Sequence, residues 1–147
     1  MKKILVLFAL VAFFSQAHGQ AEGKSAQVQV QVPSVVITSF KSSYPSVENP
    51  VWRKSGTYYV VDYTQNSNDM YVMYDASGKV TEVGEGVSAT AYPAPLTTYV
   101  KTKYKDDHLK KVYKVKNAEG KTIWKGKVKE DYLLFDENGN YIKMEKD

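Results

Sequence analysis

The stretch VPSVVITSFKSSY, residues 32–44, decides the fold that the sequence predicts. A second stretch, YPAPLTTYVKTKY at residues 92–104, superimposes on it with a shift of 60 residues. In both stretches large apolar residues recur at positions i, i+4 and i+8, which places them on one face of a helix. They are Val36, Phe40 and Tyr44 in the first stretch and Leu96, Val100 and Tyr104 in the second. We therefore expect two helices, each with one apolar face.

Prolines mark where these helices begin and end. Pro33 and Pro93 stand near the start of each stretch, where a helix tolerates proline because the first N–H groups have no partner inside the helix. Pro45 follows Tyr44, and a residue before proline is pushed out of the helical conformation. The first helix is therefore expected to end at residue 44.

After each helix the pattern changes to period two, which is typical of strands. The first half contains TYYVVDY at residues 57–63 and DMYVMY at residues 69–74. In the second half Trp124 and Val128 share one strand face, and the opposite face carries Lys121, Lys125, Lys127 and Lys129. A sheet with one packed face and one solvated face, covered by a helix, makes a complete two-layer unit.

Two similar turns close the two halves of the chain. DASGK at residues 75–79 matches DENGN at residues 136–140 with a shift of 61 residues. In both, Asp opens a hairpin turn by bonding to its own backbone, and Gly supplies a positive φ. The sequence therefore predicts an α+β protein built from two tandem α-β-β-β-β repeats, each a helix on an antiparallel sheet. Whether the two repeats share one continuous sheet is left open.

The chain divides into five predicted segments. Residues 1–19 form a signal peptide, because two lysines precede an apolar run that ends in small residues. Residues 20–31 form a tail with a short strand, residues 32–83 and 92–147 are the two repeats, and residues 84–91 are a linker. There is no cysteine, so neither a lipid anchor at the cleavage site nor a disulfide is expected. The predicted location is the periplasm or the exterior.

The end of the tail and the first residue of the first repeat form QVQVQV at residues 27–32, whose strict alternation predicts a short uncharged strand. This strand could pair with a sheet edge of its own chain, or it could add to the sheet of another chain.

The quoted residues resemble a family, the PepSY-like domains of short secreted Bacteroidota proteins, also described as beta-lactamase-inhibitor-protein-like, or BLIP-like. The resemblance rests on the opening at residues 32–45, on Trp52, and on the close YVMYDASGK at residues 71–79. It implies an α+β fold, with a helix against an antiparallel sheet, that is similar to inhibitors binding enzymes through an exposed sheet surface. The family brings no catalytic residues. The second repeat departs from the opening, with Tyr92, Val100 and Lys105 in place of valine, phenylalanine and proline.

Catalytic chemistry has little support in the sequence. Beyond the signal peptide the only histidine is His108, and no nucleophile motif or glycine-rich phosphate loop accompanies it. The Asp-containing turns lack the sixth-position glycine and distant glutamate of a calcium loop. The whole chain has 20 basic and 16 acidic residues, a balance that does not favour nucleic-acid binding. We therefore expect no enzyme, cofactor, metal or nucleic-acid partner.

Aromatic residues are the unusual feature, with 12 Tyr, 5 Phe and 2 Trp. Tyr58 and Tyr59 are adjacent, so one of them lies on the face away from the core. If Asp62 marks the solvated face, Tyr58 and Val60 share it, and exposed aromatic rings carry binding energy in interfaces. The simpler interpretation is that the rings only cover a thin sheet. The candidate binding residues are Trp52, Tyr58, Val60, Tyr71 and Ile123.

The sequence favours an exported binding module, for example an inhibitor-like protein of an envelope or extracellular enzyme. It would meet an unidentified protein partner through its sheet face and hairpin loops, as a monomer or weak oligomer without a membrane span. The alternative is a structural component of the envelope that assembles by strand addition.

Overall fold

The structure is a computed structural model that describes residues 30–104 and 109–146. A helix followed by four strands occurs twice along the chain, with one short 3-10 turn, η1, before the second helix. The first half holds α1 (Ser34–Ser43), β1 (Val51–Ser55), β2 (Tyr58–Gln65), β3 (Asn68–Tyr74) and β4 (Val80–Gly86). The second half holds η1 (Ala89–Ala91), α2 (Ala94–Tyr104), β5 (Lys111–Asn117), β6 (Thr122–Val128), β7 (Asp131–Phe135) and β8 (Tyr141–Lys146).

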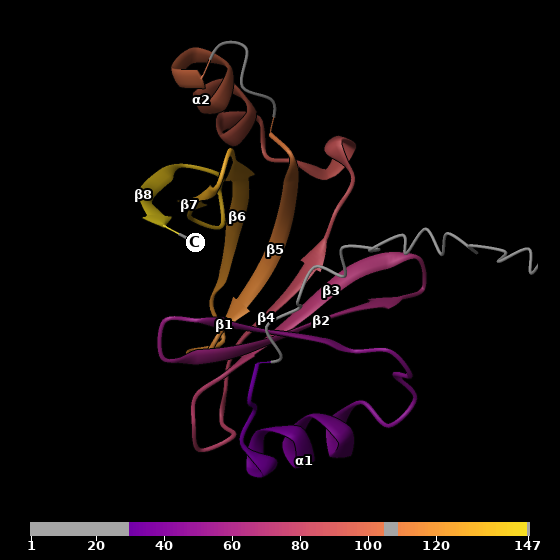
Figure 1. Cartoon of the computed structure of the whole chain (residues 1–147). Coiled ribbons are helices and arrows are strands. Elements are labelled where there is room, and N and C mark those ends of the chain that lie inside the picture. The colour runs from indigo at the N-terminus through magenta and orange to yellow at the C-terminus, as the bar shows by residue number, and fades with distance from the viewer. Residues whose placement is uncertain (1–29, 105–108, 147) are drawn as a thin grey trace, which may run out of the picture.

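All eight strands form one antiparallel sheet in the order of the sequence, from β1 to β8. The sheet is strongly curved into a half-barrel, with α1 beside the first half and α2 beside the second (Figure 1). The expected α+β class is therefore confirmed. The two halves join where β4 pairs with β5, from Glu82 opposite Asn117 to Gly86 opposite Tyr113. Residues 84–86, which were expected in a linker, are instead the last residues of β4.

Both helices cover the same face of the sheet. Paired residues of neighbouring strands lie on one face, and the pairs run from Val61 through Val72 and Val83 to Lys116 and Thr122. In the first half α1 contributes Val36 and Phe40 to a core with residues of β2 and β3. That core consists of Val36, Phe40, Val61, Tyr63, Val72 and Tyr74.

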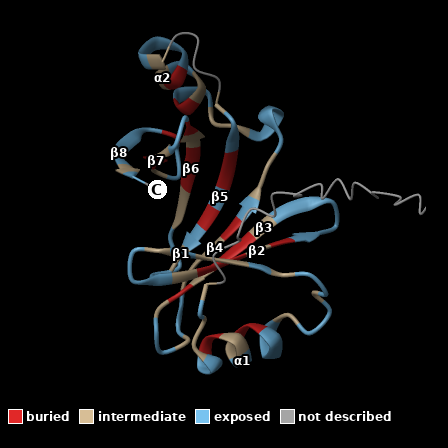
Figure 2. Cartoon of the chain, in the orientation of Figure 1, coloured by how far each residue is buried: buried red, intermediate tan, exposed pale blue. Residues whose placement is uncertain are grey.

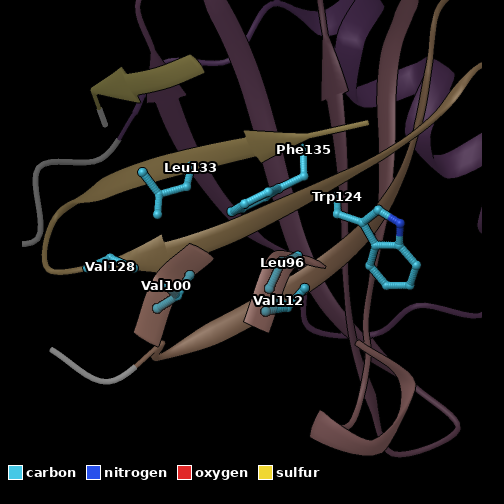
Figure 3. Packing of buried hydrophobic residues seen from close by; sticks show 7 residues of the cluster. All are labelled: Leu96, Val100, Val112, Trp124, Val128, Leu133 and Phe135. Atoms are coloured by element: carbon cyan, nitrogen blue, oxygen red, sulfur yellow. The ribbon is translucent and has the colours of Figure 1, made fainter. Parts of the chain in front are cut away.

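The second half has its own core on the same face, because Trp124 stands two residues after Thr122. Figure 3 shows its seven side chains, with Leu96 and Val100 on α2 and the others on the strands beneath. They are Leu96, Val100, Val112, Trp124, Val128, Leu133 and Phe135. The apolar faces predicted for both helices are therefore confirmed. Trp124 also donates its indole N–H to the carbonyl oxygen of Glu137 at 3.1 Å, which fixes the ring at the rim of this core.

The predicted helix boundaries and turns are confirmed. Pro33 is the N-cap of α1, and Tyr44, before Pro45, is its C-cap. At the turn after β3 the Oδ1 atom of Asp75 accepts hydrogen bonds from the backbone N–H groups of Ser77 and Lys79, and Gly78 has a φ of 84°. The turn after β7 repeats this geometry around Asp136. Hydrogen bonds, led by those from Ser77 and Asn140 respectively, lower the pKa of both aspartates.

Two expectations about the rest of the chain differ from the structure. The face without helices is not solvated at its centre, because Val60, Tyr71, Tyr113 and Val115 form a third buried cluster there. Figure 2 shows buried residues along the central strands of the sheet. Lys125, expected on a solvated face, is also buried. Strong curvature brings the side chains of this face together, which alternation along single strands does not reveal. Of the strand expected at residues 27–32, residues 27–29 lie outside the described residues, and residues 30–32 are not in a strand.

We predict that two glycine substitutions with the same backbone strain differ in cost. Gly120 and Gly139 both have a positive φ, 76° and 87°, but a Cβ at Gly120 meets nothing within 4 Å, whereas one at Gly139 would overlap the ring of Pro93. Gly120→Ala is expected to cost about 1 kcal/mol through φ alone. Gly139→Ala is expected to cost about 3 kcal/mol, because overpacking adds to the strain. Urea unfolding of both variants measures the difference; equal losses would show that α2 does not press on this turn.

Candidate functional site

The sheet face without helices, here called the open face, is the candidate site. Its shape depends on β4, which places Gly84 and Gly86 on this face opposite Tyr71 and Tyr113. A Cβ at Gly84 would overlap the Tyr71 ring, so the ring lies flat across β4 in the space that a side chain would fill. There it meets the Tyr113 ring edge to face, with the ring centroids 5.0 Å apart. The missing side chains of β4 therefore let the sheet bend at the junction of its halves.

A buried ion pair crosses the same junction. Lys125 of β6 reaches over β5, and its Nζ atom lies 2.7 Å from Oε2 of Glu82 on β4. The exposed fractions of the two side chains are only 8% and 18%. Tyr71 donates its hydroxyl hydrogen to the same Glu82 oxygen at 3.0 Å. Buried charges are tolerated only when they are paired and hydrogen-bonded, and this pair meets both conditions.

The network continues to the last strand. Lys125 Nζ lies 3.6 Å from Oε2 of Glu145 on β8, and Lys143 Nζ lies 2.8 Å from Oε1 of the same carboxylate. Burial acts to raise the pKa of Glu145, but the hydrogen bond from Lys143 and the charge of Lys125 outweigh it and lower the pKa overall. Burial, followed by the charge of Glu82, raises the pKa of Tyr71, so its phenol stays protonated and donates. Four strands, β3, β4, β6 and β8, are tied together in this way.

The network lines a small cavity of about 50 Å³. The lining residues come from both ends of the sheet: Arg53, Ser55, Tyr71, Met73, Lys125, Tyr132, Glu145 and Lys146. A cavity of this size has room for a few water molecules, whereas sites for small-molecule ligands are typically about 300 Å³ or larger. The centre of the open face therefore combines a buried apolar cluster with a paired polar network, and it is not a substrate pocket.

Around this centre the open face carries opposite charges on its two halves. Register places one basic and three acidic residues on the strands of the first half, namely Arg53, Asp62, Asp69 and Glu82. It places four basic residues and one acidic residue on the second half, namely Lys111, Lys125, Lys127, Lys143 and Glu145. Two ion pairs order the more exposed charges. Arg53 lies 2.7 Å from Asp62 within the first half, and Lys111 lies 2.6 Å from Asp69 across the two halves.

The structure distributes the predicted binding residues over both faces. Tyr58 lies on the open face and is 42% exposed. Val60 shares that face but is completely buried, so the expectation that it is exposed is wrong, and Tyr71 is only 4% exposed. Ile123 is half-buried and packs against the buried cluster that contains Val60 and Tyr71. Trp52 lies on the helix side, with its ring centroid 5.6 Å from that of Phe40.

Sequence reasoning missed Glu82 and Lys125 as the centre of this face. Lys125 stands among four lysines that alternate with other residues, so nothing in its neighbourhood distinguishes it. A usable signal was the pair Gly84 and Gly86, because glycines two apart within a strand mark a close approach of another group on one face. No group of three or more His, Cys, Asp or Glu residues that could hold a metal ion occurs within residues 30–104 and 109–146. His108 lies outside the described residues.

We predict that Lys125→Met destabilises the protein by about 3 kcal/mol, because it leaves the Glu82 carboxylate buried without its cation. Adding Glu82→Gln is expected to recover part of this loss, since the second substitution removes the unpaired charge. The matched control is Lys143→Met, whose side chain is 59% exposed and whose loss is expected to be much smaller than that of Lys125→Met. Urea unfolding of the three variants gives the comparison. Equal losses for Lys125→Met and Lys143→Met would contradict a structural role of the buried pair.

Comparison with solved structures shows which known fold this is, although no protein-family model and no curated protein sequence matches the chain. A candidate periplasmic protein from Bacteroides eggerthii superimposes with a TM-score of 0.63 at 19% identity, over 80% of this chain and 90% of that one. A DUF2874 family protein from Bacteroides ovatus gives a TM-score of 0.60 at 18% identity, over 80% and 89%. A BLIP-like protein from Bacteroides fragilis gives 0.55 at 19% identity, over 80% and 87%. The chain therefore has the fold of the BLIP-like and DUF2874 proteins, as the resemblance of its motifs implied.

Proposed function

We propose that this chain is an exported, non-enzymatic binding module that holds a protein partner against its open face. The proposal rests on the arrangement of buried and exposed side chains on that face. A buried and paired centre supports a rim of more exposed side chains around it. The cavity at the centre, about 50 Å³, is smaller than a small-molecule site requires. An inhibitor-like role towards an envelope or extracellular enzyme is the form of this function that the BLIP-like neighbour suggests.

The rigid centre favours binding at the rim. Association is weakened when side chains and loops must be ordered on contact, so a surface that is already fixed loses less entropy. On the open face the network of Glu82 and Lys125 and the packing of Tyr71 on Tyr113 provide this order before any partner arrives. The partner would then contact side chains whose positions are set by the sheet beneath them.

The rim offers the residue types that protein interfaces use. Tyr58 and Val51 are exposed at opposite ends of the β1–β2 pair, 42% and 65% respectively. Across the cavity Tyr132 carries Lys127 over its ring at 5.1 Å, which combines an aromatic surface with a cation. Tyrosine is enriched at interfaces because its ring is apolar and its hydroxyl can find a hydrogen bond. Among the five candidate binding residues, Tyr58 is the one best placed to meet a partner.

The groove along α1 gives a catalytic role little support. A groove of about 630 Å³ runs along α1, but the residues that line it are hydroxyl-bearing or apolar and include no acid or base other than a tyrosine. They are Ser34, Val35, Thr38, Ser39, Ser42, Ser43, Tyr74, Gly78 and Val80. The groove therefore lacks the titratable groups that general acid–base chemistry requires.

Export and domain organisation belong to the same proposal. A signal peptide at residues 1–19 would deliver the chain to the periplasm or the exterior, which agrees with the candidate periplasmic neighbour. Among the described residues no helix is both long enough and apolar enough to span a membrane.

Residues 32–83 and 92–147 are proposed as two copies of one unit. Equivalent turn glycines support this, because Gly78 lies against Val35 and Ser39 of α1, and Gly139 lies against Pro93 and Leu96 at the start of α2.

We expect a photo-crosslinking amino acid at position 58 to capture a discrete partner in the source organism, because Tyr58 is exposed on the open face. The matched control is the same amino acid at position 35, since Val35 is similarly exposed, 46% against 42%, but lies on α1 on the opposite side. Mass spectrometry of the adducts identifies the captured protein. Identical adducts from both positions, or adducts from position 35 alone, would contradict recognition through the open face.

A further inference from the structure

The outer edge of β8 is exposed and apolar. In the described part of the chain β8 pairs with β7 alone, so no strand forms a ladder with the backbone groups of its other side. Seven large hydrophobic residues are exposed in the described chain, and three of them lie on this six-residue strand: Tyr141 at 39%, Ile142 at 51% and Met144 at 45%. A strand edge of this kind is a template for pairing with another strand.

The opposite edge of the sheet, β1, is less suited to pairing with itself. It is five residues long and carries the two cations Arg53 and Lys54. An antiparallel pair of β1 strands centred on Arg53 would place like charges opposite each other, which is unfavourable. Centred on Trp52, it would place Pro50, which has no N–H group, opposite Lys54.

Among the three registers centred on Lys143, Met144 and Glu145, the sequence of β8 favours one. Neighbouring residues of a strand alternate between faces, and paired residues share a face. A symmetric pair that continues the sheet is therefore centred on a residue, not between two residues. Centring on Lys143 or on Glu145 puts identical charges opposite each other. Centring on Met144 puts Lys143 of each copy opposite Glu145 of the other, with the two Met144 side chains in contact at the axis.

We propose that two copies of this chain associate through their β8 strands, antiparallel and centred on Met144, into one continuous sixteen-stranded sheet. The contact is isologous, because the same surface is used on both copies and the pair closes on itself. It joins sheet edges, and its test does not involve Tyr58, so its failure and the failure of the proposed partner-binding function are distinguishable.

Charges on the open face support the same register. Lys143 and Glu145 lie 2.8 Å apart within one copy, and their side chains are 59% and 38% exposed. In the proposed pair the two residues of each copy meet those of the other copy, so four charges alternate in sign around the axis. On the other face Met144 loses its exposed surface to Met144 of the second copy, which the hydrophobic effect favours.

Cysteine crosslinking tests the register directly, because the natural chain has no cysteine. In residues 20–147 carrying Met144→Cys, the two Cα atoms at the axis would be about 4.5–5.5 Å apart, within the range of about 4.4–6.8 Å that a disulfide needs. We expect a covalent dimer on mild oxidation at micromolar concentration. The matched control is Val35→Cys, which has nearly the same exposure, 46% against 45%, but lies on α1.

We expect dimer to form at least about ten times faster from Met144→Cys than from Val35→Cys, because pairing raises the effective concentration of the two thiols. Equal rates would overturn the proposal, since they would show random collision. An equimolar mixture of Met144→Cys and Val51→Cys separates edge types. Mixed dimers as abundant as Met144→Cys dimers would show that β8 pairs with β1 of another copy and would also overturn it.

A charge reversal checks that the register, and not only the edge, is right. Lys143→Glu combined with Met144→Cys places glutamates opposite each other, and we expect crosslinking to slow by about tenfold because two opposite-charge pairs become like-charge pairs. Circular dichroism and urea unfolding confirm that this variant is folded before its rate is compared. An unchanged rate in the folded variant would exclude the Met144-centred register.

Discussion

The ion pair between Glu82 and Lys125 is the interaction on which the rest of the open face depends. It joins a strand of the first half to a strand of the second across the intervening β5, with 2.7 Å between Nζ and Oε2. The Tyr71 hydroxyl donates a hydrogen bond to the same carboxylate, and Glu145 extends the network to the last strand. Each buried charge has a partner, and a buried charge is tolerated only when it is paired. Burial of these charges therefore depends on the curvature of the sheet, because the curvature brings the partner strands together.

Glycines on β4 make that curvature possible. Tyr71 lies in the space that a side chain at Gly84 would occupy, and Asp69 approaches Gly86 closely enough that a Cβ there would lie 3.0 Å from its carbonyl oxygen. Because β4 presents no bulk at these positions, residues of β3 reach β5 directly, as Tyr71 does with Tyr113 and Asp69 with Lys111. The two halves of the chain thus share one curved sheet, and both helices lie on the same face of it, each over its own half.

The two faces of the sheet and its β8 edge have different roles in this structure. The helix side holds two apolar cores, one beneath each helix, and gives the sheet its stability. The open face has a buried centre, part apolar cluster and part ion-pair network, and a more exposed aromatic and charged rim. Such a face suits a protein partner better than a small substrate. The edge strand β8 concentrates exposed apolar side chains beside alternating charges, a combination that a copy of the same strand complements.

The sequence by itself determined the elements: two helices from the i, i+4, i+8 spacing of Val36 and Leu96, strands from alternation, and hairpin turns from Asp75 and Asp136. These depend on interactions within a few residues, which local patterns record. Only the tertiary structure decided that one sheet contains all eight strands, that Val60 and Tyr71 are buried, and that Lys125 meets Glu82 at a separation of 43 residues. Those features arise from the curvature of the whole sheet, and no short stretch of sequence contains both partners of a contact that the curvature creates.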